Sequence, residues 1–94
     1  MKHYVYLIYS EKSNIYYKGE SSRPMERLCE HNENKSVYTS NKGPWALVYL
    51  EEFETRGDAL KREKMLKRQN RKYLEWLIKQ PTNILLNADL SRLG

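Results

Sequence analysis

The chain begins with the stretch that decides its fold, YVYLIY (residues 4–9), SEKSN (10–14) and IYYKG (15–19). Aromatic and β-branched residues dominate the first and last of these segments, as is typical of β-strands. The polar segment between them has the composition of a turn. We therefore predict a β-hairpin over the first 19 residues. Because side chains alternate along a strand, the residues expected to share a face are Tyr4, Tyr6 and Ile8 on the first strand and Ile15, Tyr17 and Gly19 on the second.

Three further elements follow the hairpin. The segment SSRP (21–24) reads as a helix entry because proline suits a first helical turn, and this helix should end near Asn32. A polar loop (33–42) then leads to WALVYL (45–50), a third strand that we expect to continue through Phe53.

Two helices are predicted in the last part of the chain. TRGD (55–58) matches a capping box and predicts a helix over 58–69. Asn70 can cap another helix, which would run to about Lys79 and be stopped by Pro81.

The order of elements is therefore β-β-α-β-α-α, a three-stranded antiparallel sheet flanked by helices in an α+β fold. Its 94 residues allow one domain, and we assign residues 1–80 to it, with 81–94 as a C-terminal tail packing on the same domain.

The composition limits where the protein acts and what it binds. The longest apolar runs (4–9 and 45–50) are six residues each, whereas a membrane helix needs about 20, so no membrane span is expected. The single Cys29 excludes an intrachain disulfide, and a cytoplasmic location is the default. A net charge of +5 favours polyanionic partners.

Glu63 is out of place in the helix predicted from residue 58. Ala59, Leu60 and Leu66 define the apolar stripe of this helix, and Glu63 falls inside it. A carboxylate on a buried face is costly unless it is paired or binds a cation. Both a structural salt bridge and a metal ligand satisfy this condition.

The helix that begins at residue 24 carries a second pair of candidates. Met25, Leu28 and Cys29 are expected to pack on the sheet, with Arg27 and His31 together on the opposite side. A solvated polar face is one interpretation. The other is a phosphate site, because arginine presents a fixed fork of donors and histidine can move a proton near neutral pH.

Basic side chains form a third group of candidates. Seven of the twelve residues in 61–72 are cations, which is typical either of a solvated helix surface or of a phosphate-backbone contact. The candidates for nucleic-acid binding are Lys61, Arg62, Lys64, Lys67, Arg68, Arg71 and Lys72, together with Arg27.

The ordered set of these motifs resembles the GIY-YIG nuclease superfamily, particularly its small bacterial single-domain branch and the GIY-YIG domain of the excinuclease ABC nuclease subunit. Tyr4-Val5-Tyr6 is similar to the first family tripeptide, with Tyr4 at a glycine position, and Tyr17-Lys18-Gly19 is similar to the second. The resemblance extends over residues 3–78 through MERLCEHN (25–32), YT (38–39), PWALVY (44–49), EEF (51–53) and ALKREK (59–64).

The resemblance implies a metal-dependent endonuclease that hydrolyses phosphodiester bonds in DNA, with a role in repair or in the processing of DNA structures. It places Tyr6 and Tyr17 beside the scissile phosphate, with Tyr6 as general base. Arg27 would hold the phosphate, His31 would assist, and Glu63 would coordinate one Mg²⁺ or Mn²⁺ ion. It implies no small-molecule cofactor and leaves the oligomeric state open.

Three points stay open beside this resemblance. The family also uses a downstream asparagine, for which Asn83 and Asn87 are both candidates. Lys18 stands where an apolar residue is usual, and Glu20 adds an acidic group near a site for a polyanion. The alternative function is a nucleic-acid-binding module of the same fold that does not cut.

Overall fold

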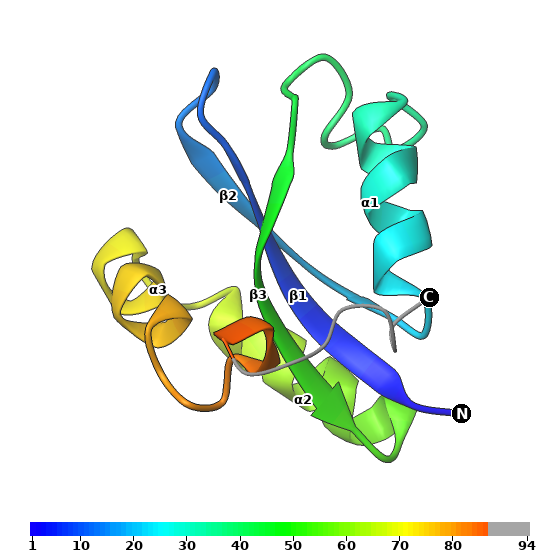
Figure 1. The fold of residues 1–94 in the computed structure, drawn as a ribbon, viewed down its shortest axis with the longest axis vertical. Helices are drawn as coiled ribbons and strands as arrows, with labels where there is room; N and C mark the ends of the chain where they lie inside the picture. The colour runs from blue at the N-terminus through cyan, green and yellow to red at the C-terminus, as the bar shows by residue number, and fades with distance from the viewer. Residues whose placement is uncertain (87–94) are drawn as a thin grey trace.

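The computed structural model describes residues 1–86. A three-stranded antiparallel sheet in the order β2-β1-β3 forms its centre (Figure 1). The elements are β1 (His3–Ser10), β2 (Ile15–Ser21), α1 (Pro24–Asn32), β3 (Ala46–Phe53), α2 (Arg56–Leu66), α3 (Arg71–Ile78) and the 3-10 turn η1 (Ile84–Leu86). The predicted α+β class and order of elements are confirmed.

The local signals in the sequence explain where the elements start. Pro24 occupies the first turn of α1, Thr55 caps α2 by accepting from the amide of Asp58, and Asn70 caps α3 by accepting from the amide of Tyr73. These side-chain oxygens satisfy amides that have no partner within their helix.

The hairpin turn closes on an asparagine. Asn14 has φ 55°, a left-handed conformation that asparagine tolerates better than most residues. Its side chain accepts a hydrogen bond from the Tyr9 hydroxyl at 2.7 Å.

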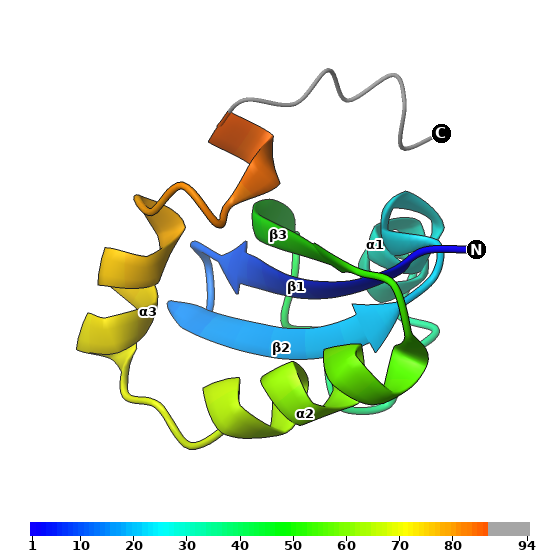
Figure 2. The ribbon, with the colours of Figure 1, turned by 90° about the horizontal axis from the view of Figure 1, so that it is seen from below.

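The two faces of the sheet are covered by different helices. In Figure 2, α2 lies below the strands and η1 above them. Val5 and Leu7 of β1 pack with Tyr49 against α2 and α3. Tyr6 and Ile8 point to the other face, where the buried core also includes Leu50 and Trp45, with Leu28 of α1 and Ile84 of η1 packed against it.

Three side chains differ from the sequence-based expectation. Leu60 is 39% exposed, because the buried line of α2 passes through Ala59 and Leu66 only. Cys29 is exposed rather than packed on the sheet. His31 is fully buried, because with Pro24 and Leu28 it forms the line of α1 that faces the strands. The placement of Arg27 and His31 away from the sheet was therefore wrong.

The end of the chain is described in part. Asn83 is 1% exposed, and its side chain accepts from the amides of Leu50 and Leu85 and donates to the carbonyls of Val48 and Ile78. These bonds attach the segment before η1 to β3. Residues 87–94, including the candidate Asn87, lie outside the described residues, and the division of the chain at residue 80 stays a prediction.

Within residues 1–86, no helix combines the length and apolar composition that crossing a bilayer requires.

Candidate active site

Tyr6 lies at the centre of the candidate site, on the face of the sheet that α1 covers. It is paired in register with Gly19 of the neighbouring strand. A Cβ atom at residue 19 would lie 2.3 Å from the Tyr6 hydroxyl oxygen, which no real side chain allows. The tyrosine ring therefore lies across the backbone of β2, and this close approach requires glycine at position 19.

His31 joins Tyr6 to the loop that follows α1. Its Nε2 is 2.9 Å from the Tyr6 hydroxyl, and its Nδ1 is 2.7 Å from the Thr39 hydroxyl. Burial, with a smaller effect of the Arg27 charge, lowers the pKa of His31 to about 4. The imidazole is therefore neutral at pH 7, with one nitrogen donating and the other accepting.

Tyr17 completes a series of aromatic contacts. It is a diagonal neighbour of Tyr6 across the β1–β2 pair, since Tyr6 faces Gly19 and Ile8 faces Tyr17. Its ring centre lies 5.1 Å from that of His31 and 5.5 Å from that of Tyr38. The expectation that Tyr6 and Tyr17 share one site agrees with this geometry.

Arg27 brings a positive charge to the same place. It lies one helical turn before His31, its side chain is 32% exposed, and it donates to Glu30 at 2.8 Å. Burial raises the pKa of Tyr6 well above its usual range and the nearby Tyr17 adds to this, while the Arg27 guanidinium opposes the shift. Arg27 is thus close to the tyrosine pair and still partly open to solvent.

Glu63 approaches the site from a different element. It belongs to α2, which packs on the opposite face of the sheet, and its charge has the smallest of the effects that shift the pKa of Tyr6. Its carboxylate is 17% exposed and forms an i,i+4 ion pair with Lys67 at 3.8 Å. The structure thus groups the other four candidates closely and places Glu63 at their edge.

The donor set around Glu63 was compared with the needs of a hard divalent ion. No group of three or more His, Cys, Asp or Glu side chains suited to a metal occurs within residues 1–86. Mg²⁺, however, is often held by one carboxylate, with water and phosphate oxygens filling its shell. Over the same residues, the Glu63 carboxylate accepts no hydrogen bond and has only the long Lys67 contact. It therefore fits a site of this kind.

The two departures from the family pattern lie away from Tyr6. Glu20 pairs with Arg56 at 3.4 Å and with His3 at 3.5 Å, on the face that α2 covers. Its charge is therefore met by Arg56 rather than directed at the tyrosines. Lys18 is half-buried and alternates to the same face as Glu20.

The predicted basic residues fall into two groups. Arg62 donates to Glu51 at 2.9 Å, and Arg71 donates to the side chain of Asn14 at 3.0 Å and lies over the Tyr16 ring. These guanidinium groups hold the fold together. Lys67 pairs with Glu63, and Arg27 pairs with Glu30. The remaining predicted residues, which are exposed and form no ion pair or side-chain hydrogen bond within the described part of the chain, are Lys61, Lys64, Arg68 and Lys72.

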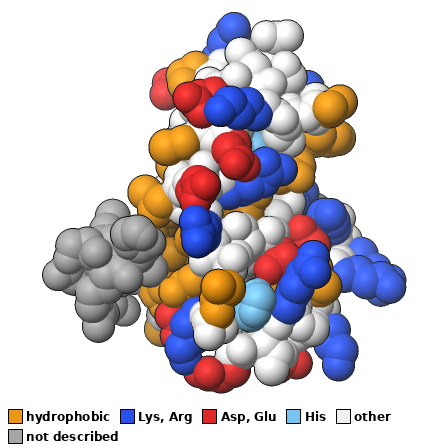
Figure 3. Space-filling model, turned by 90° about the vertical axis from the view of Figure 1, so that its right-hand side faces the viewer, with side chains coloured by type: hydrophobic (Ala, Val, Ile, Leu, Met, Phe, Trp, Pro, Cys, Tyr) orange, Lys and Arg blue, Asp and Glu red, His pale blue; other side chains and the backbone are white. Residues whose placement is uncertain are grey.

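The side of the molecule that carries α1 has a mixed charge. Figure 3 shows acidic and basic side chains interspersed over this side rather than a continuous basic surface. Electrostatic attraction to a polyanion would therefore act mainly through the exposed cations of α2 and its C-terminal end.

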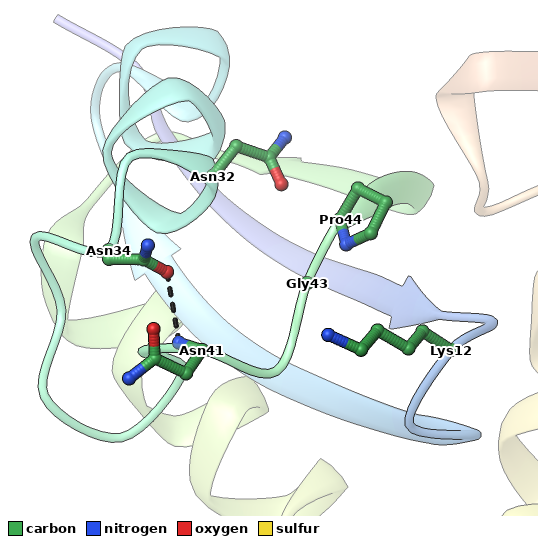
Figure 4. Close-up of a pocket in the computed structure, with 6 residues that line it drawn as sticks. All are labelled: Lys12, Asn32, Asn34, Asn41, Gly43 and Pro44. Atoms are coloured by element: carbon green, nitrogen blue, oxygen red, sulfur yellow. Dashed lines mark hydrogen bonds between the residues drawn. The ribbon is translucent and has the colours of Figure 1, made fainter.

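A polar hollow of about 380 Å³ lies between the hairpin turn and the loop after α1 (Figure 4). The Asn32 amide bonds both the amide and the carbonyl of Trp45, and Asn34 accepts from the amide of Asn41 at 2.9 Å. These bonds use the polar groups to fix the loop. We therefore assign this hollow to the structure of the loop and not to the active site.

Sequence reasoning gave no role to Thr39 and Tyr38. Thr39 is fully buried and holds the second nitrogen of His31, while Tyr38 is 65% exposed beside Tyr17. The available signal was a Tyr-Thr pair inside an otherwise polar loop. This pair indicates a role in the site only when the structure shows that Thr39 contacts His31 and Tyr38 contacts Tyr17 of the hairpin.

Comparison with known proteins agrees with the fold. The family model described as the GIY-YIG catalytic domain matches residues 2–83, so the chain belongs to the GIY-YIG family. This is a nuclease family, and the substrate class that it implies is nucleic acid.

Within that family, the chain is similar to UPF0213 proteins. One from Staphylococcus haemolyticus is 37% identical over 67 residues, which cover 70% of this chain and 80% of that protein. One from Enterococcus faecalis is 34% identical over 80 residues, covering 82% of this chain and 90% of that protein. The solution NMR structure of a UPF0213 protein from Bacillus halodurans is 26% identical, has a TM-score of 0.57 and covers 96% of both chains.

Proposed function

We propose that this protein is a metal-dependent endonuclease that hydrolyses phosphodiester bonds in DNA. The observation that supports this most is the meeting of Tyr6, Tyr17, Arg27 and His31 on one face of the sheet. Two hydroxyls, one imidazole and one guanidinium at a single place match the needs of phosphoryl chemistry, which depends on positioning and charge stabilisation.

Arg27 is the residue assigned to the phosphate. Its side chain is partly exposed, and its fork of donors suits two phosphate oxygens. It would hold the scissile group beside the Tyr17 hydroxyl and stabilise the charge that develops there. Glu30, which binds Arg27 at 2.8 Å, fixes the direction of the guanidinium.

Tyr6 is assigned to proton transfer, and His31 holds its hydroxyl in place. A tyrosine with a raised pKa is a poor base by itself, because its phenolate is scarce at pH 7. Neutral His31 orients the phenol, because its Nε2 can accept a hydrogen bond from the Tyr6 hydroxyl while its Nδ1–H donates to Thr39, but its lowered pKa makes it a poor acceptor of the proton itself. The Arg27 guanidinium lowers the pKa of Tyr6 against the effect of burial, so its charge would favour loss of the phenol proton to solvent. The phenolate then acts as the general base toward the attacking water.

Glu63 is the residue that would hold one divalent ion, Mg²⁺ or Mn²⁺. When bound, the ion would supply a Lewis acid for a phosphate oxygen. Lys67, the only ion-pair partner of Glu63 among the described residues, has an exposed and flexible side chain and can release the carboxylate. We retain a cytoplasmic location as part of the proposal, in keeping with the exposed free thiol of Cys29.

The test is cleavage of plasmid and branched DNA in Mg²⁺ or Mn²⁺ by the wild type and by Glu63→Gln. Glu75→Gln is the matched control, because Glu75 lies on the exposed side of α3 and forms no ion pair within residues 1–86. We expect cleavage by the wild type and by Glu75→Gln, and a loss of at least about 100-fold in Glu63→Gln, the scale of removing one catalytic electrostatic group.

Two results would count against the nuclease. If all three proteins bind DNA and none cuts any substrate in either metal, the chain is the non-catalytic binding module considered above. If Glu63→Gln cuts as fast as the wild type, the assignment of the metal to Glu63 is wrong.

A further inference from the structure

A groove of about 390 Å³ borders the candidate active site along the outer edge of β2. Its lining, which we name the tyrosine groove, consists of Tyr16, Tyr17, Lys18, Tyr38 and Lys67. The strand is at the edge of the sheet, so the groove is open on the side away from β1. Its volume lies in the range of about 300–1,000 Å³ that is usual for small-ligand sites.

The groove is connected to the catalytic tyrosines by aromatic contacts. From Tyr6, the ring centres run to His31 at 5.9 Å, then to Tyr17 at 5.1 Å and to Tyr38 at 5.5 Å. The first rings of this series are buried, whereas Tyr38 is 65% exposed. Tyr17 belongs both to the candidate active site and to the groove, so a ligand in the groove is next to the place assigned to the phosphate.

The charges in the groove are positive. Lys18 of β2 and Lys67, which follows α2, both line it, and the pKa of Lys18 is lowered by burial and by the Lys67 charge. Two ammonium groups that repel one another favour an anion between them. The Lys42 ammonium adds a third cation, 4.4 Å from the centre of the Tyr38 ring.

Aromatic rings interleaved with lysines form the surface that binds single-stranded nucleic acid: bases stack on the rings and phosphates meet the cations. A base inside a duplex is stacked on both sides, so it cannot enter a groove of this size without leaving the helix. The combination therefore selects a nucleotide that is already unpaired.

We propose that the tyrosine groove binds an unpaired nucleotide directly beside the phosphodiester bond to be cut. The preferred substrate is then DNA with a single-stranded segment at the cleavage position, such as a flap or a branch. This inference rests on the proposed nuclease function for the phosphate position, while the binding itself does not depend on cleavage. It also gives a role to Lys18, which replaces an apolar residue of the family pattern.

The experiment measures binding in EDTA, where no metal-dependent cleavage occurs. Fluorescence anisotropy compares a labelled single-stranded oligonucleotide with its blunt duplex, for the wild type, Tyr38→Ala, Tyr38→Phe and the neighbouring control Val37→Ala. Val37 is 97% exposed, so its truncation tests only the loop. We expect Tyr38→Ala to weaken single-strand binding roughly 5- to 100-fold, which corresponds to the loss of one stacked base.

The other variants define what a stacking site requires. Tyr38→Phe keeps a ring and should bind the single strand like the wild type, and so should Val37→Ala. Duplex binding should change less than about twofold in every variant. Lys18→Gln should change the salt dependence of single-strand binding. The slope of log Kd against the logarithm of the salt concentration should fall by about 0.7, the contribution of one phosphate contact.

A base analogue reports on the stacking directly. A 2-aminopurine in the single strand should lose fluorescence when the wild type binds and retain it with Tyr38→Ala. The proposal is overturned if Tyr38→Ala binds the single strand as tightly as Val37→Ala does, or if it weakens duplex and single strand equally.

Failure of this inference is distinct from failure of the nuclease. A protein that cuts DNA in Mg²⁺ with equal rates for wild type and Tyr38→Ala on flaps keeps the proposed function and loses the groove. A protein that shows the Tyr38-dependent binding but never cuts keeps the groove and loses the nuclease.

Discussion

A methyl group added at residue 19 tests the most crowded contact of the site. In Gly19→Ala the new Cβ would lie 2.3 Å from the Tyr6 hydroxyl oxygen and 2.4 Å from Cζ, so the ring must move by about 1 Å to reach ordinary contact. Tyr6 is 2% exposed, so its ring cannot simply move out into solvent. Overpacking costs about 1–3 kcal/mol. Breaking the hydrogen bond to His31 leaves buried polar groups unpaired, at about 1–3 kcal/mol more.

We therefore expect Gly19→Ala to lower the free energy of unfolding by about 2–5 kcal/mol in urea denaturation. Gly57→Ala is the matched control. Residue 57 lies in the first turn of α2, and a Cβ atom added there would have its nearest neighbour, Thr55 Oγ1, 4.0 Å away. Alanine favours the helix there, so this variant should be as stable as the wild type or up to about 1 kcal/mol more stable. If Gly19→Ala loses less than about 1 kcal/mol, the close packing of Tyr6 over β2 is refuted.

Two further predictions concern stability. The pKa of His31 is lowered from 6.5 to about 4, so the unfolded chain binds the proton more tightly, and stability should fall as pH drops from about 6.5 toward 4. Between pH 7 and pH 5 the unfolding free energy should decrease by about 2 kcal/mol more in the wild type than in His31→Phe, and equal pH slopes in urea titrations would contradict this. Asn83→Ala removes four hydrogen bonds from a buried side chain and should cost about 3–5 kcal/mol. The control Gln80→Ala removes one hydrogen bond to a carbonyl and should cost less than about 1 kcal/mol. Both variants are compared by thermal unfolding. A similar loss of unfolding free energy in the two would show that Asn83 has no special structural role.

The elements were predictable because their signals are local. Each signal determines the conformation of residues close to it in the sequence. Examples are the turn between two tyrosine-rich segments, the proline at residue 24 and the caps Thr55 and Asn70. Packing was less predictable, because it depends on how a helix is rotated against the sheet. For this reason Cys29 was expected to be buried and His31 exposed, whereas the structure shows the reverse. A sequence shows which residues are apolar, but it does not show that hydrogen bonds to Tyr6 and Thr39 make a buried histidine tolerable.

The site was predicted in its parts rather than in its arrangement. Tyr6, Tyr17 and Arg27 could be proposed from the family motifs, and the structure places them close together. The engagement of Arg62 with Glu51 could not be proposed, because these residues meet only through the folding of α2 onto β3. A run of cations in a sequence therefore does not distinguish charges that bind a partner from charges that hold the fold.

The central claim, that Arg27 stabilises a phosphate at the tyrosine pair, is tested most directly by single-turnover cleavage of flapped DNA with Mg²⁺. Arg27→Ala is compared with Arg23→Ala, since Arg23 is the N-cap of α1, Arg27 lies one turn further on, and each pairs with a glutamate three residues later. We predict that Arg27→Ala slows cleavage by about 100-fold or more while Arg23→Ala stays within about threefold of the wild type. Equal rates for the two variants and the wild type would contradict the proposed active site.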